Sequence, residues 1–148
     1  MKKILFLLGL LTAGTTLTFA QDKTGDLLNR YYSLKDALVS GNATLAAEQA
    51  KAFATDAGNL EGDQGKALAK TAGQIAGTGD IEKQRSYFSS CSEEMLRLVK
   101  TAPTHAAPVY KMYCPMKKAS WLSSENTVRN PYFGNRMLSC GSVTETIR

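Results

Sequence analysis

The position of proline divides this chain into two parts with different folding possibilities. All four prolines follow residue 100 and are Pro103, Pro108, Pro115 and Pro131. Residues 22–100 contain no proline and are rich in alanine, leucine, lysine and glutamate. Because proline lacks a backbone N–H and its ring clashes with the preceding helical turn, long uninterrupted helices are expected only in the first part.

Apolar residues of the first part recur at the spacing of an α-helix. Leu27, Tyr31, Leu34 and Leu38 form one apolar stripe, and Gly41 suits the position that follows a helix end. Three further segments with this spacing begin near residues 42, 63 and 80, where asparagine or aspartate can cap a helix start. The pattern predicts a mainly α fold, with a four-helix up-down bundle over residues 21–101.

Residues 102–148 lack helical periodicity and are expected to form a small cap on the bundle. The segments Pro108–Cys114 and Cys140–Ile147 are rich in β-branched and aromatic residues, which favour strands. Between them, the N-P-Y-F-G stretch at Asn130–Gly134 has the residues of a turn. The sequence thus predicts a single domain over residues 21–148, whose cap contains one or two short strands.

The first twenty residues have the pattern of a secretory signal peptide. Lys2 and Lys3 precede an apolar run from Ile4 to Leu11, and small or polar residues lead to Ala20. The apolar run is too short to cross a bilayer as a helix. We therefore expect cleavage near Ala20 and a periplasmic or secreted mature chain.

Several classes of function are not expected from this sequence. The chain has a formal net charge of +5, but its basic and acidic residues are interspersed, which argues against nucleic acid as a partner. No segment after the leader is long and apolar enough for a membrane-embedded protein. A G-x-S-x-G motif is absent and His105 is the only histidine, so we do not expect an enzyme.

Sulfur-containing side chains in the cap form the candidate site. Cys114 and Met116 are two residues apart, and Met137 and Cys140 are three residues apart. Thiolate and thioether ligands select soft cations such as Cu(I) or Ag(I) over hard cations. The indole ring of Trp121 could cover a bound cation. This pattern indicates a metal site made of these five side chains.

Other interpretations of the cysteines stay open at this point. In an oxidising compartment, Cys114 and Cys140 could form a disulfide that closes a loop of about 25 residues and stabilises the fold by about 3.5 kcal/mol. From the residues alone, this disulfide is favoured over metal binding, and free buried thiols are a third option. Cys91 lies on an apolar helical stripe and is predicted to be a core residue. His105 is predicted to lie in an exposed loop, with a role as an additional ligand as the alternative.

Four motifs of the cap, together with a helical segment, form an ordered set. The motifs are C-P-M at Cys114–Met116, W-L-S at Trp121–Ser123, N-P-Y-F-G at Asn130–Gly134 and M-L-x-C-G at Met137–Gly141, and the helical segment is Asp80–Met95. This set resembles an uncharacterised family of exported bacterial domains. Its members occur alone or at the C-terminus of adaptor (membrane-fusion) subunits of heavy-metal efflux pumps of the resistance-nodulation-division class. The resemblance extends from about Leu27 to Ile147.

The resemblance implies handling of copper or silver in the periplasm, and it places metal binding ahead of the disulfide. It implies a carrier that passes Cu(I) or Ag(I) to a pump adaptor subunit or to another periplasmic metal carrier. The expected ligands are Cys114, Met116, Met137 and Cys140, shielded by Trp121. The alternative is a non-catalytic envelope interaction module, in which a Cys114–Cys140 disulfide stabilises the cap. In that module, exposed Tyr132 and Phe133 would dock on a partner.

Overall fold

The computed structural model describes residues 16–102 and 105–148, so the expected signal peptide, residues 1–20, lies largely outside the described residues. The first part of the chain forms four helices, which confirms the predicted number. They are α1 (Thr16–Ser40), α2 (Ala43–Gly58), α3 (Asp63–Ala76) and α4 (Ile81–Thr101). Within these described ranges, no helix has both the length and the apolar character that a membrane crossing requires.

Short polar segments set the helix boundaries where the sequence predicted them. Gly41 has a φ of 74°, a left-handed conformation that ends α1 without the steric cost a side chain would add. The side chain of Asn42 accepts a hydrogen bond of 3.0 Å from the backbone N–H of Leu45 and caps α2. The side chain of Asp80 accepts one of 2.9 Å from the N–H of Glu82 and caps α4.

The core forms along the predicted apolar stripe of α1. Tyr31, Leu34 and Leu38 are fully buried, and the ring of Tyr31 stacks on that of Phe88 from α4 with centroids 5.2 Å apart. The helices α2 and α3 contribute small buried alanines, which allow close approach but bury little apolar area per residue. The larger buried side chains of these two helices are Phe53, Leu68 and Ile75, so all four helices contribute large side chains to the core.

The cap contains a three-stranded antiparallel sheet, which corrects the prediction of one or two strands. Its strands are β1 (Val109–Cys114), β2 (Ala119–Ser123) and β3 (Ser142–Ile147), in the order β2-β1-β3. A short 3-10 helix, η1 (Gly134–Arg136), precedes β3. The additional strand is β2, which follows β1 after a four-residue turn and pairs Ala119 with Cys114.

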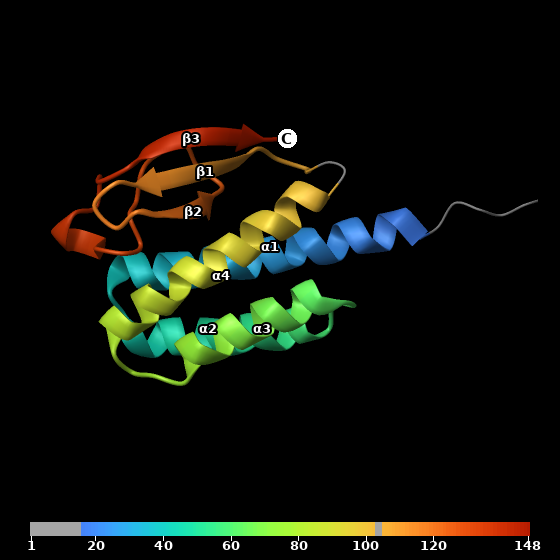
Figure 1. The fold of residues 1–148 in the computed structure, drawn as a ribbon, viewed down its shortest axis with the longest axis horizontal. Coiled ribbons are helices and arrows are strands. Elements are labelled where there is room, and N and C mark those ends of the chain that lie inside the picture. Colours follow the sequence, from blue (N-terminus) through green and yellow to red (C-terminus); the bar gives the residue numbers. More distant parts are fainter. Residues whose placement is uncertain (1–15, 103–104) are drawn as a thin grey trace, which may run out of the picture.

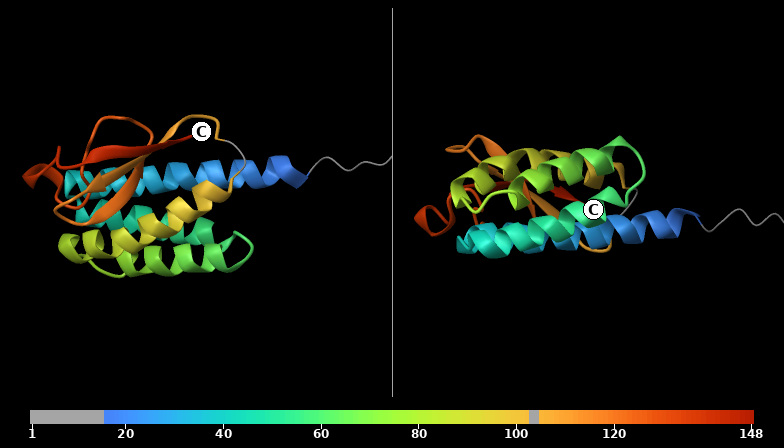
Figure 2. Two further views of the ribbon diagram at one scale, coloured as in Figure 1. Left: turned by 45° about the horizontal axis from the view of Figure 1, so that its top comes forward. Right: turned by 90° about the horizontal axis from the view of Figure 1, so that it is seen from below.

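The sheet lies over α1 and α4, on the side opposite to α2 and α3 (Figure 1). Figure 2 shows that the sheet covers the end of the bundle where α1 ends and α4 begins. The hydroxyl of Tyr31 joins these layers, because it lies 2.7 Å from Ser92 Oγ in α4 and accepts a hydrogen bond of 3.1 Å from the N–H of Leu122 in β2. One buried hydroxyl thus connects α1, α4 and the sheet.

A buried arginine makes a second connection between bundle and cap. Arg85 in α4 donates hydrogen bonds to the carbonyl of Leu38 at the end of α1 (2.9 Å) and to the carbonyl of Pro131 in the cap (3.1 Å). Its remaining contact is an ion pair of 2.9 Å with Glu82. Gly134 packs against this arginine with a φ of 54°, and a Cβ there would lie 2.8 Å from the carbonyl oxygen of Val39.

Candidate functional site

Two of the predicted ligands meet at the end of the sheet. Cys114 is the last residue of β1, and Cys140 comes two residues before β3. Because β1 and β3 are antiparallel and Tyr113 pairs with Ser142, the residue after Tyr113 is brought beside the segment that precedes β3. As a result, Cys114 Sγ and Cys140 Sγ lie 3.4 Å apart, and both are free cysteines.

Backbone groups of the turn between β1 and β2 surround this sulfur pair. The N–H of Lys117 donates a hydrogen bond of 3.4 Å to Cys114 Sγ, and the N–H of Lys118 donates one of 2.8 Å to the carbonyl of Cys114. On the other side, the side-chain amide of the fully buried Asn130 donates a hydrogen bond of 2.6 Å to the carbonyl of Cys140. These contacts hold Cys114 through its sulfur and its carbonyl, and Cys140 through its carbonyl.

The environment separates the pKa values of the two thiols. Burial of Cys114 acts to raise the pKa of its thiol. Hydrogen bonds from the N–H of Lys117, the thiol of Cys140 and the amide of Asn130 have the opposite effect. Together they outweigh burial, so the pKa of Cys114 lies below its usual value. The pKa of Cys140 is raised, chiefly because its proton is shared with Cys114. The pair can therefore hold one proton between two sulfurs, with Cys114 as the preferred thiolate.

The two predicted methionine ligands lie at the surface near the pair. Met116 is 67 % exposed, and its backbone N–H also hydrogen-bonds to the cysteine sulfurs. Met137 is partly exposed, and its carbonyl accepts a hydrogen bond of 3.1 Å from the N–H of Cys140. Both thioethers are thus carried on chain segments that are attached directly to the thiol pair.

Trp121 lies behind the site rather than at its surface. It is 1 % exposed and packs edge-to-face on Tyr132 with ring centroids 6.0 Å apart. A Cβ added at Gly141 would lie 2.8 Å from Cη2 of this ring, so the indole lies directly against the backbone that follows Cys140. Gly141 also has a φ of 141°, which favours glycine.

The remaining cysteine and the histidine lie apart from the pair. Cys91 is fully buried in α4, as predicted for a core residue, and burial raises the pKa of its thiol to about 12. His105 is half-buried, and its Nε2 lies 2.9 Å from the carbonyl oxygen of Val99 near the end of α4. In residues 16–102 and 105–148, no three or more His, Cys, Asp or Glu side chains form a group suited to a metal ion.

The expectation that Tyr132 is an exposed docking residue is wrong. Tyr132 is 2 % exposed, and its ring fills the space between Phe88 of α4 and Trp121 of β2. Its hydroxyl donates a hydrogen bond to the carbonyl of Ser120. Phe133 is half-buried, with the guanidinium of Arg136 6.0 Å from its ring centroid. The N-P-Y-F-G stretch therefore attaches the cap to the bundle.

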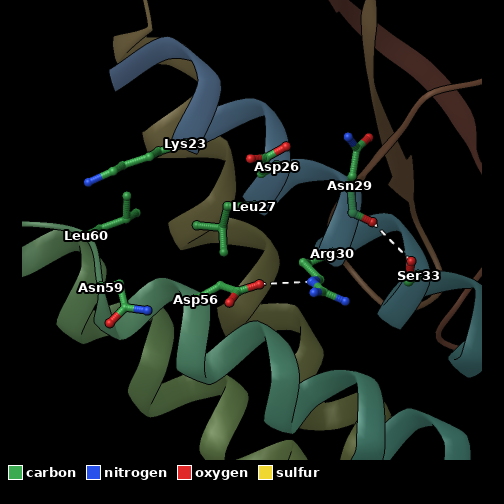
Figure 3. Close-up of a pocket in the computed structure, with 9 residues that line it drawn as sticks. All are labelled: Lys23, Asp26, Leu27, Asn29, Arg30, Ser33, Asp56, Asn59 and Leu60. Atoms are coloured by element: carbon green, nitrogen blue, oxygen red, sulfur yellow. Dashed lines mark hydrogen bonds and ion pairs between the residues drawn. The ribbon is translucent and has the colours of Figure 1, made fainter. Parts of the chain in front are cut away.

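A surface pocket of about 540 Å³ lies between α1 and the end of α2, away from the cysteine pair. Figure 3 shows the ion pair of 2.9 Å between Arg30 and Asp56 that crosses it. Its remaining lining residues are Lys23, Asp26, Leu27, Asn29, Ser33, Asn59 and Leu60. None of these residues carries sulfur, and the charges of Arg30 and Asp56 compensate each other. The cysteine pair therefore remains the candidate site.

The described structure is thus a four-helix domain with a three-stranded antiparallel sheet that holds two cysteines in contact. A family model described as "Protein of unknown function (DUF3347)" matches residues 27–106, more than half of the chain. The chain therefore belongs to this family. Comparisons with curated proteins and with solved structures give no significant match.

The family match covers a different extent from the resemblance seen in the sequence. It includes most of α1, all of α2 to α4, and ends before β1. The cap motifs and the association with efflux adaptors therefore stay predictions.

Sequence reasoning missed the contact that Asn130 makes, because the Asn-Pro pair indicated only a turn. Its amide instead positions the carbonyl of Cys140.

Proposed function

We propose that the protein binds Cu(I) or Ag(I) through the thiols of Cys114 and Cys140 and carries the ion in the periplasm, in connection with heavy-metal efflux. The observation that carries this proposal is the separation of 3.4 Å between two sulfurs from distant parts of the chain. Two metal–sulfur bonds of about 2.3 Å can span such a separation. A site whose thiols are its strongest donors favours a soft ion over Mg²⁺ or Ca²⁺.

The surroundings of the pair support uptake and release of an ion. The hydrogen bonds that lower the pKa of Cys114 keep one sulfur ready as a thiolate, and Cys140 gives up its proton when the ion binds. The thioethers of Met116 and Met137 act as accessory ligands at the surface, through which the ion enters and leaves. Trp121 closes the inner side of the site, and the four-helix up-down bundle holds the cap rigid.

A titration with Ag(I) or Cu(I) against a competing chelator tests this proposal. The reduced protein is expected to bind one ion, and Cys114→Ala should weaken binding by about 100-fold, equal to about 2.8 kcal/mol. The double change of Met116 and Met137 to leucine should weaken binding by about tenfold. Cys91→Ala is the matched control and should bind as the unchanged protein does. Unchanged affinity in Cys114→Ala would refute the proposed site.

The same sulfur contact favours a second candidate function. In it, Cys114 and Cys140 form a disulfide that stabilises the cap of a non-catalytic interaction module. A thiol count on protein prepared without reductant separates the two candidates. One free thiol, from Cys91, together with no metal uptake, would favour the interaction module. Three free thiols with metal uptake would favour the carrier.

A further inference from the structure

The net charge of the chain is concentrated in the cap. Residues 23–102 contain ten basic and ten acidic residues and have no net charge. Residues 105–148 have a formal charge of +4. Their acidic residues are Glu125 and Glu145, and their basic residues are Lys111, Lys117, Lys118, Arg129, Arg136 and Arg148. The domain is thus neutral on its helical side and positive on the side that carries the cysteine pair.

Neither acidic residue of the cap compensates the charge beside the thiols. Glu145 Oε2 lies 2.8 Å from Lys100 Nζ, and this pair joins β3 to the end of α4. Glu125 follows β2, at the end of that strand opposite to the β1–β2 turn. Arg136 makes an ion pair of 2.8 Å with Glu82. Lys117 and Lys118 are exposed, and neither forms an ion pair with any residue in the described part of the chain.

The position of Lys118 has a conformational cost. Its φ of 56° is the one positive value among described residues other than glycine. Glycine or asparagine would adopt this left-handed conformation with less strain. Turn geometry therefore does not explain why a lysine occupies this position. Because strained backbone positions are concentrated at functional sites, the conformation of Lys118 is consistent with a functional role for its side chain.

Exposed apolar side chains lie in the two chain segments that meet at the thiol pair. Met116 precedes Lys117 in the turn, and Met137 and Leu138 lie in the segment that leads to Cys140. We name Met116, Lys117, Lys118, Met137 and Leu138 the cap rim. Exposed apolar side chains together with unpaired basic residues in these two segments suit a docking surface for a protein partner.

We propose that the cap rim docks on an acidic protein surface that gives the soft ion to Cys114 and Cys140 or takes it from them. This inference rests on the proposed function. A second copy of the chain does not fit as the partner, because two cap rims would bring like charges together. Opposite charges would steer the encounter, whereas the thioethers and thiols would exchange the ion after contact.

The experiment uses two synthetic peptides loaded with Ag(I). Both carry the same Met-X-X-Met core, one flanked by aspartate and glutamate and the other by lysine. Transfer is followed by stopped-flow fluorescence of Trp121, the only tryptophan, which lies against Gly141 beside Cys140. At an ionic strength of about 10 mM, the acidic peptide should transfer Ag(I) about tenfold faster. At about 1 M salt, the two rates should converge.

A pair of charge variants locates the effect. Lys117→Glu with Lys118→Glu should reverse the preference, so that the lysine-flanked peptide becomes the faster donor. Lys66→Glu with Lys70→Glu makes the same change in net charge on exposed positions of α3 and should keep the preference for the acidic peptide. The emission maximum of Trp121 verifies that the cap is folded in each variant. If the α3 variant reverses the preference as the cap-rim variant does, net charge and not the cap rim is responsible.

The remaining outcomes separate this inference from the proposed function. Equal rates from both peptides at low salt would overturn the docking surface, while Ag(I) binding to the thiols would still stand. Failure to take up Ag(I) from either peptide or from free Ag(I) would overturn the proposed function and the docking surface with it. Binding to phosphatidylglycerol vesicles that requires Lys117 and Lys118, with no preference between peptides, would identify a membrane surface and refute the protein partner.

Discussion

At the scale of single residues, the contact between Gly141 and Trp121 determines where Cys140 lies. A Cβ at position 141 would lie 2.8 Å from Trp121 Cη2 and 2.9 Å from the carbonyl oxygen of Tyr113. Neither neighbour can move freely, because the carbonyl belongs to β1 and the indole is buried against Tyr132. A side chain at this position must therefore displace the backbone that carries Cys140.

We predict that Gly141→Ala destabilises the protein by about 1–3 kcal/mol, because an overpacked site forces its neighbours to shift. The fluorescence of Trp121 should change as the ring is displaced. Gly73→Ala is the matched control, since nothing lies within 4 Å of a Cβ at that position in α3. That change should stabilise the protein by about 0.4–1 kcal/mol. Chemical denaturation measures both, and equal stability of the two variants would contradict the contact.

The buried thiol of Cys91 predicts a loss of stability at alkaline pH. Its pKa is about 12 in the folded protein, so the folded state keeps the proton that the unfolded chain releases near pH 9. Between these values, the free energy of unfolding should fall by up to about 1.4 kcal/mol per pH unit from this group. Cys91→Ala should remove that part of the slope. The free energy of unfolding is measured against pH for both proteins. If it falls equally steeply with pH in Cys91→Ala and in the unchanged protein, Cys91 is not the responsible group.

At the scale of elements, the helices and the strands differ in how far the sequence predicts them. The starts of α2 and α4 follow from capping by Asn42 and Asp80, which are contacts between residues two or three apart. Strand β2 has a weak local signal, because Trp121 is its one residue of a type that favours strands. It becomes a strand by pairing with β1 and packing on α4. Tertiary packing therefore overrode its local preference.

At the scale of the whole molecule, a few buried side chains attach the cap to the bundle. The hydroxyl of Tyr31 binds groups of α4 and β2, and the guanidinium of Arg85 binds carbonyls at the end of α1 and in the cap; both side chains are buried. Tyr132 adds apolar contact between Phe88 and Trp121. The cysteine pair is consequently held by a cap whose position depends on residues far from it.

We predict that Arg85→Met destabilises the protein by about 1–3 kcal/mol, because it removes the donor to the buried carbonyl of Pro131 and leaves that of Leu38 with the N–H of Gly41 alone. The matched control is Arg97→Met, which removes a surface pair with Glu94 and should cost about 0–1 kcal/mol. Urea denaturation measures both. If loss of Arg85 leaves stability unchanged, the guanidinium does not hold the cap to the bundle.

The sequence by itself determined the four helices, their ends, the burial of Cys91 and the net positive charge of residues 105–148. These properties depend on residue spacing, capping and composition, which act over a few positions of the chain. Only the tertiary structure decided that Cys114 meets Cys140 and that Tyr132 is buried. The contact between the two thiols joins residues 26 positions apart and depends on the register of β1 against β3, and the ring of Tyr132 packs on Phe88 of α4; local preferences specify neither contact.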